Sequence, residues 1–91
     1  MGNDIPSEVI AYYQALYPDS SITPATTYES LGLIGEDRVI SIMNLEDNFG
    51  IPPDPHDAKG IFTIGQAIIL IEEKELQTGS ASSIEPEAPS T

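Results

Sequence analysis

The sequence predicts an all-α fold, an antiparallel helical bundle of three main helices plus a short helix or turn, with a long first loop. Three segments carry apolar residues at the three- and four-residue steps that are typical of amphipathic helices. Prolines and glycines lie between these segments, where they interrupt helical hydrogen bonding. Because 91 residues support only one modest hydrophobic core, residues 1–77 are expected to form one domain.

The first predicted helix begins near residues 4–5 and ends at Tyr17, before Pro18. Pro6 lies at an early position, where its missing N–H costs nothing. Gln14 is expected to face water. The inward stripe is formed by Ile5, Val9, Tyr13 and Leu16.

A long loop rich in Ser, Thr and Pro follows, over residues 18–33. It contains a short predicted turn at residues 27–31. Leu31 and Leu33 are expected to anchor this loop to the core.

The second predicted helix spans residues 36–48. Glu36 and Asp37 lie in its first turn, where the helix dipole favours negative charge, and Gly50 ends it. Its inward face is formed by Val39, Ile42, Met43, Leu45 and Phe49.

A proline-rich link over residues 52–60, with a short helical turn at residues 56–59, leads to the last predicted helix. Thr63 and Gln66 have the spacing of a capping box at its start. Its inward stripe is formed by Ile64, Ala67, Ile68 and Ile71.

The apolar run at residues 68–71 also permits a short buried strand, but no second strand lies nearby to pair with it, so helix is favoured. Packing in the core is favoured over a ligand cavity for the same run. After Gln77 the tail, residues 78–91, is too polar to bury and is predicted to be a disordered acidic Ser/Pro-rich segment.

The net charge of the chain indicates which kind of molecule it can bind. Fifteen acidic and three basic residues give a formal net charge of -12, which repels phosphate backbones and excludes nucleic acid. The same charge attracts proteins with basic docking surfaces. No apolar run reaches membrane-spanning length and the first residues lack signal-peptide features, so a cytoplasmic monomer without membrane insertion is expected.

Catalysis and metal binding find little support in the residue pattern. With no cysteine there is no thiolate metal site, and the acidic segments lack the ligand spacing of a calcium loop. His56 is the only histidine, and we expect an exposed loop residue and not a general base. The protein is therefore predicted not to be an enzyme and to hold no metal.

Three stretches resemble a known family. Residues 27–33 (Thr-Tyr-Glu-Ser-Leu-Gly-Leu) resemble the Thr-x-x-x-Leu-Gly approach to the second helix of the acyl carrier proteins. Residues 49–51 (Phe-Gly-Ile) resemble the end of that helix, and residues 61–65 (Ile-Phe-Thr-Ile-Gly) resemble the approach to the last one. The resemblance covers residues 23–72 and implies an acidic bundle that shuttles acyl chains in fatty acid or polyketide synthesis.

The resemblance fails where the family attaches its cofactor. The family has Asp-Ser-Leu, whose serine carries 4′-phosphopantetheine, at positions that are Ile34, Gly35 and Glu36 here. Glycine has no hydroxyl, so the resemblance implies that no cofactor is bound unless a variant serine is used. Ser30 is the best alternative, although it lies too far from Phe49 for the family spacing. Ser41 is predicted to be a surface helix residue.

The preferred function is an acyl-carrier-protein-like binding module without the arm, associated with fatty acid, polyketide or peptide synthesis machinery. One alternative is a functional acyl carrier that uses Ser30, and another is an unrelated small acidic helical adaptor. Arg38 is expected to weaken attraction for a basic partner and to pair with neighbouring carboxylates. The candidate partner-binding residues, which could also simply solvate the helix, are Glu36, Asp37, Val39, Ile40, Met43, Glu46 and Asp47.

Overall fold

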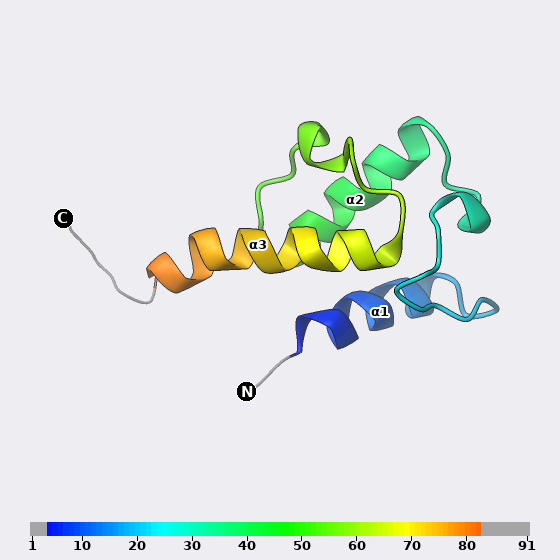
Figure 1. Ribbon diagram of the computed structural model, residues 1–91, viewed down its shortest axis with the longest axis horizontal. Coiled ribbons are helices and arrows are strands. Elements are labelled where there is room, and N and C mark those ends of the chain that lie inside the picture. Colours follow the sequence, from blue (N-terminus) through cyan, green and yellow to red (C-terminus); the bar gives the residue numbers. More distant parts are fainter. Residues whose placement is uncertain (1–3, 83–91) are drawn as a thin grey trace.

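The structure is a computed structural model in which residues 4–82 are described. Its elements in chain order are α1 (Ile5–Leu16), the 3-10 helix η1 (Glu29–Leu31), α2 (Glu36–Asn48), the 3-10 helix η2 (Pro55–Ala58) and α3 (Ile64–Ser82) (Figure 1). The predicted all-α bundle is confirmed. The strand alternative for residues 68–71 is wrong, because this run lies inside α3.

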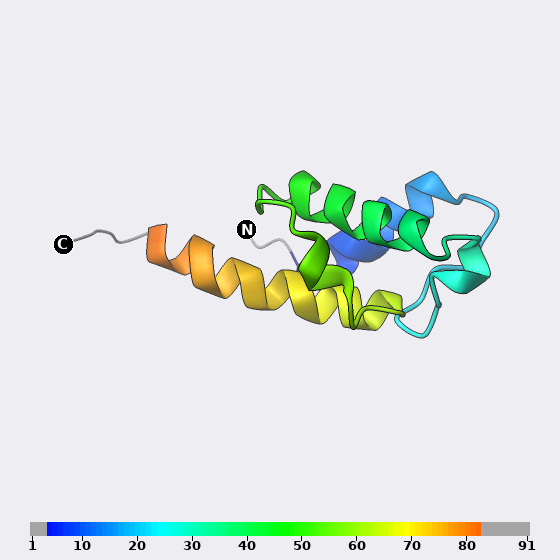
Figure 2. The same cartoon turned by 90° about the horizontal axis from the view of Figure 1, so that it is seen from above.

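Two packing contacts organise the bundle. α1 packs against α3, and α2 packs against η2 in the link before α3. The last turns of α3 project beyond the other helices in both views (Figures 1 and 2). α3 continues to Ser82, past Gln77 where the sequence predicts its end, because no proline intervenes and extending a formed helix costs little. The rest of the predicted tail, residues 83–91, lies outside the described residues.

The first loop is held by one polar side chain of α1. The Gln14 amide donates hydrogen bonds to the carbonyls of Tyr17 and Ser20, and its oxygen accepts one from the Ile22 N–H. The prediction that Gln14 faces water is therefore wrong. A long loop leaves many backbone groups without helical partners, and this side chain satisfies three of them.

Two loop residues enter the core more deeply than the predicted anchors do. Tyr28 is fully buried and Ile22 nearly so, whereas Leu31 and Leu33 pack against the core with partial burial. The Tyr28 hydroxyl donates to the Tyr13 hydroxyl at 2.9 Å. The loop is thereby joined to α1 through the centre of the molecule.

α2 begins and ends at the residues that the sequence predicts. At its C-terminus the N–H of Gly50 bonds to the carbonyl of Asp47, and the N–H of Ile51 bonds to the carbonyl of Glu46. With φ of 75° at Gly50, this is a Schellman motif, which satisfies carbonyls that the helix leaves open.

α3 begins with the predicted capping box. The Thr63 hydroxyl accepts from the N–H of Gln66, and the Gln66 side chain accepts from the N–H groups of Phe62 and Thr63. The loop preceding η1 is bonded to this start, since the N–H groups of Tyr28 and Ile64 donate to the carbonyls of Phe62 and Thr26.

The core lies where the three helices meet. Leu16 is 54% exposed, so its predicted inward position is wrong: it is the last residue of α1, and its side chain lies largely in solvent. The buried apolar residues are Val9, Tyr13, Ile22, Tyr28, Ile42, Leu45, Ile51, Ala58, Ile64, Ala67, Ile68, Leu70 and Ile71.

Candidate functional site

The junction before α2 is built around Gly35. This glycine is the residue immediately before the helix and has φ of 57° and ψ of −129°. A Cβ added there would meet no atom within 4 Å, so space for a side chain exists. The backbone is nevertheless in a conformation that residues with a Cβ adopt only with strain. The junction therefore combines an open position with a backbone suited to glycine.

The hydroxyls nearest to this junction in the sequence are engaged in the fold. Ser30 is exposed in η1, and its hydroxyl donates to the Thr27 carbonyl at 2.7 Å. Ser41 lies on α2 with its oxygen 3.2 Å from the Tyr13 hydroxyl, in a partly buried position. The prediction of Ser41 as a plain surface residue is therefore wrong, because it faces α1.

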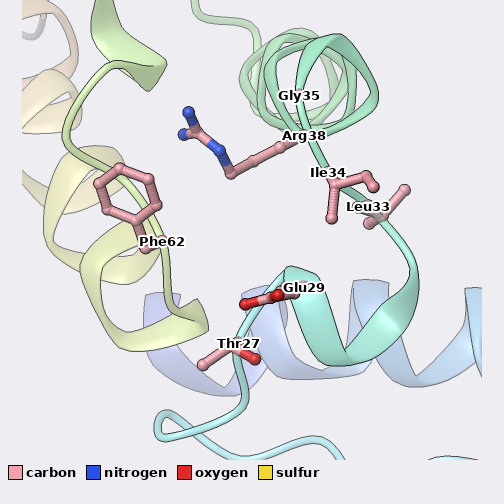
Figure 3. Close-up of a pocket in the computed structure, with 7 residues that line it drawn as sticks. All are labelled: Thr27, Glu29, Leu33, Ile34, Gly35, Arg38 and Phe62. Carbon is pink, nitrogen blue, oxygen red and sulfur yellow. The ribbon is translucent and has the colours of Figure 1, made fainter.

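A cavity of about 290 Å³ lies beside Gly35, between η1, α2 and the start of α3 (Figure 3). Leu33 and Ile34 lie on one side of it and Phe62 on the other, and Glu29 and Arg38 contribute opposite charges to its lining (Figure 3). Its lining residues are Thr27, Glu29, Leu33, Ile34, Gly35, Arg38 and Phe62.

Arg38 connects the first half of α2 to the link before α3. Its guanidinium donates to the carbonyls of Ala58 and Ile61, at 2.5 and 2.6 Å, and lies 4.4 Å from the centre of the Phe62 ring. The prediction that Arg38 pairs with neighbouring carboxylates is wrong, because these carbonyls take its donors. The cation consequently points toward the link (Figure 3).

The exposed face of α2 carries both acidic and apolar groups. Glu36, Asp37 and Asp47 are exposed, and Ile40 is 48% exposed between them. Met43 and Val39 are half-buried. Positions 36, 40, 43 and 47 follow helical spacing and share one side of the helix. This side therefore presents an apolar strip with carboxylates at both ends.

Glu46 does not belong to this exposed face. Its side chain is fully buried, and Oε1 accepts a hydrogen bond from the Asp54 N–H at 3.0 Å. The prediction of Glu46 as a partner-binding residue is wrong, because the proline-rich link folds over the end of α2 and covers it. The signal that could have separated it from the exposed Asp47 is helical spacing, since Glu46 lies four residues after Ile42 and three before Phe49 on the inward face.

His56, the only histidine in the sequence, lies on η2. The His56 side chain is 78% exposed, as predicted, and its Nδ1 lies 3.5 Å from Asp54 Oδ1. Over residues 4–82 no group of three potential metal ligands comes together. In the same range no helix is both long and apolar enough to cross a membrane.

Comparison with known proteins gives a consistent set of relatives. The chain is 39% identical over 67 residues to acyl carrier protein 5, chloroplastic, of Arabidopsis thaliana, which covers 74% of this chain and 48% of the relative. It is 36% identical over 67 residues to acyl carrier protein, chloroplastic, of Brassica napus, covering 74% and 50%. It is 32% identical over 66 residues to acyl carrier protein 2, chloroplastic, of Spinacia oleracea, covering 72% and 51%.

The chain spans about half the length of the curated relatives that it matches. No protein-family model matches it, and no solved structure matches it at a significant level.

Proposed function

We propose, since this chain belongs to the acyl carrier protein family, that it is a carrier-fold binding module that works without a phosphopantetheine arm. The observation that carries the proposal is Gly35 at the start of α2, where the family pattern places its attachment serine. Attachment requires a hydroxyl oxygen that attacks the pyrophosphate of coenzyme A. Glycine offers no such oxygen, and its backbone at this point disfavours residues that would.

Docking of this module is assigned to the exposed side of α2. A partner with basic side chains around an apolar contact would match Ile40 and Met43 between the carboxylates of Glu36, Asp37 and Asp47. Ile40 also borders a hollow of about 220 Å³ between α1 and α2. Because Arg38 is turned toward the link, its charge does not interrupt this surface. The partners proposed are enzymes of fatty acid, polyketide or peptide synthesis.

The functional acyl carrier that uses Ser30 remains the alternative. Ser30 is exposed, which favours modification, but its hydroxyl is bonded to the Thr27 carbonyl in a 3-10 turn. The alternative of an unrelated acidic adaptor is wrong, because the sequence identity to acyl carrier proteins extends over about three quarters of the chain. The relatives are named as chloroplastic, so they favour an organelle and give no support to the predicted cytoplasmic location.

To test whether the chain lacks a phosphopantetheine arm, the intact mass of the protein is measured before and after incubation with coenzyme A and a broad-specificity phosphopantetheinyl transferase. We expect an unchanged mass for the natural chain. A matched positive control carries Ile34→Asp, Gly35→Ser and Glu36→Leu, which restore the family pattern, and should gain the phosphopantetheine mass. An increment on the natural chain would overturn the proposal, and peptide mapping would show whether Ser30 carries it.

Docking is tested by titrating the protein with an acyl-chain synthesis enzyme from the same source. Asp37→Lys and Ile40→Asp should weaken binding at least tenfold. Glu73→Lys is the matched control, since it makes the same charge change on an exposed residue of α3. Equal losses for Asp37→Lys and Glu73→Lys would mean that only net charge is recognised.

A further inference from the structure

Two carboxyl groups, one fully buried and one 16% exposed, lie together where α2 meets η2. Glu46 is fully buried, and its Oε2 finds no hydrogen-bond donor among the described atoms. The Oδ2 of Asp57 on η2 is also buried, and the Lys74 ammonium lies 3.3 Å from it as an ion pair. The Glu46 and Asp57 side chains are within hydrogen-bonding reach of each other. Two carboxylates are acceptors only, so this contact becomes a hydrogen bond only if one of them carries a proton.

We propose that Glu46 and Asp57 share one proton, and that loss of this proton loosens η2 from α2. In the closed state, in which η2 packs against α2, Glu46 is a neutral acid that donates from Oε2, and Asp57 is the anion that accepts. In the open state η2 is loosened from α2. When the proton passes to solvent, both groups are anions, one fully buried and the other 16% exposed.

The charged groups around the pair explain why the proton is held. From α3, the Lys74 ammonium lies 3.3 Å from Asp57 Oδ2, and this pair is largely buried. From the link, Asp54 gives Glu46 only its backbone N–H, while its side chain bonds to the backbone N–H of His56. One ammonium cannot balance two carboxylates. Burial is the main cause that raises the pKa of Glu46, to about 7, and the hydrogen bond with Asp57 raises it further.

The direction of the pH effect follows from this raised pKa. The closed state keeps a proton that the open state releases above the ordinary glutamate value of 4.5. Closure is therefore fully favoured below about pH 4.5 and is progressively lost as pH rises to about 7. Arg38 still holds the Ala58 and Ile61 carbonyls, so the opening is confined to the first half of the link.

The first test is a carbon-13 NMR titration of the Glu46 side-chain carboxyl in the full chain. We expect its midpoint near neutral pH. A Glu46 midpoint in the ordinary range would overturn the proposal, even if every variant failed to fold.

The second test compares Glu46→Gln with the natural chain by amide hydrogen exchange at Asp54 and Asp57. Glutamine keeps the acceptor for the Asp54 N–H and adds an N–H donor for Asp57, but it cannot ionise. Relative to this variant, opening in the natural chain should increase on the order of a hundredfold between about pH 5 and pH 7, since proton linkage gives at most tenfold per unit. Asp47→Asn is the matched control and should keep the natural pH dependence. Identical pH profiles for Glu46→Gln and the natural chain would contradict the proposal.

Discussion

The two ends of α2 carry acidic residues in opposite environments. At the first turn Glu36 and Asp37 are exposed, and the positive end of the helix dipole favours them. At the last turn Glu46 is buried, near the negative end of the dipole and opposite a second carboxyl group. The same residue type is thus solvated at one end and buried at the other.

The link between α2 and α3 creates this difference. It is held near the first turn by the Arg38 guanidinium and covers the last turn through Asp54 and Asp57. The acidic composition of a helix therefore does not define its docking face, because a neighbouring segment can remove part of it from solvent. Substitutions at one anchor of the link, or at one end of α2, test this difference, and their expected effects on stability range from about 4 to about 0.5 kcal/mol.

Arg38→Ala is expected to have the largest effect on stability. It removes two charge-assisted hydrogen bonds and the ring contact with Phe62, and it should lower the free energy of unfolding by about 2–4 kcal/mol in urea titrations. Arg38→Lys keeps the charge but not the planar guanidinium group, and it should lower the free energy of unfolding by less than Arg38→Ala does. A loss under half a kcal/mol would show that Arg38 does not anchor the link.

Glu46→Ala and Asp47→Ala compare buried and exposed neighbours directly. At about pH 5, Glu46→Ala should cost about 1–3 kcal/mol in the same titrations, because the Asp54 N–H loses its acceptor. Asp47→Ala should stay within about 0.5 kcal/mol, as is usual at exposed positions. Similar losses for the two variants would place Glu46 in solvent, contrary to the structure.

Gly35→Ala tests the backbone at the first end of α2. Alanine has room for its Cβ but must adopt a positive φ, so we expect a loss of about 1 kcal/mol by thermal and urea unfolding. Gly60→Ala serves as the control, since Gly60 also has space but no positive φ. A stabilised Gly35→Ala variant would show that the junction relaxes to another conformation.

Asp37→Asn should have the smallest effect. Removing one carboxylate from the positive end of the dipole should destabilise the protein by about 0.5 kcal/mol at low salt. Added salt should shrink that difference. The stability difference for Glu46→Gln should respond much less to salt, because a buried group is screened weakly. If salt changed the stability differences of Asp37→Asn and Glu46→Gln equally, the two ends of α2 would not differ in solvent exposure.

Local sequence signals predicted the helices well and the site only in part. The acidic first turn, the apolar spacing and Gly50 predicted the bounds of α2, because each acts within a few residues of the helix end. The capping box of α3 was predictable for the same reason.

The partners of Arg38 and Glu46 were not predictable in this way. The carbonyls bound by Arg38 belong to residues 58 and 61, and the groups around Glu46 belong to the link and to α3. Both sets depend on how the proline-rich link packs in three dimensions. Gln14 was misjudged similarly, since its partners lie on a loop without regular structure.

The hydroxyl contacts at the centre of the bundle have a practical consequence. Tyr13 contacts Tyr28 edge to face, and its hydroxyl lies between those of Tyr28 and Ser41. The chain contains no tryptophan, so fixed tyrosine rings supply most of the near-ultraviolet circular dichroism that aromatic side chains give. Because these two rings join α1, the first loop and α2, that signal reports without any label whether the centre of the bundle stays packed while its edges are altered.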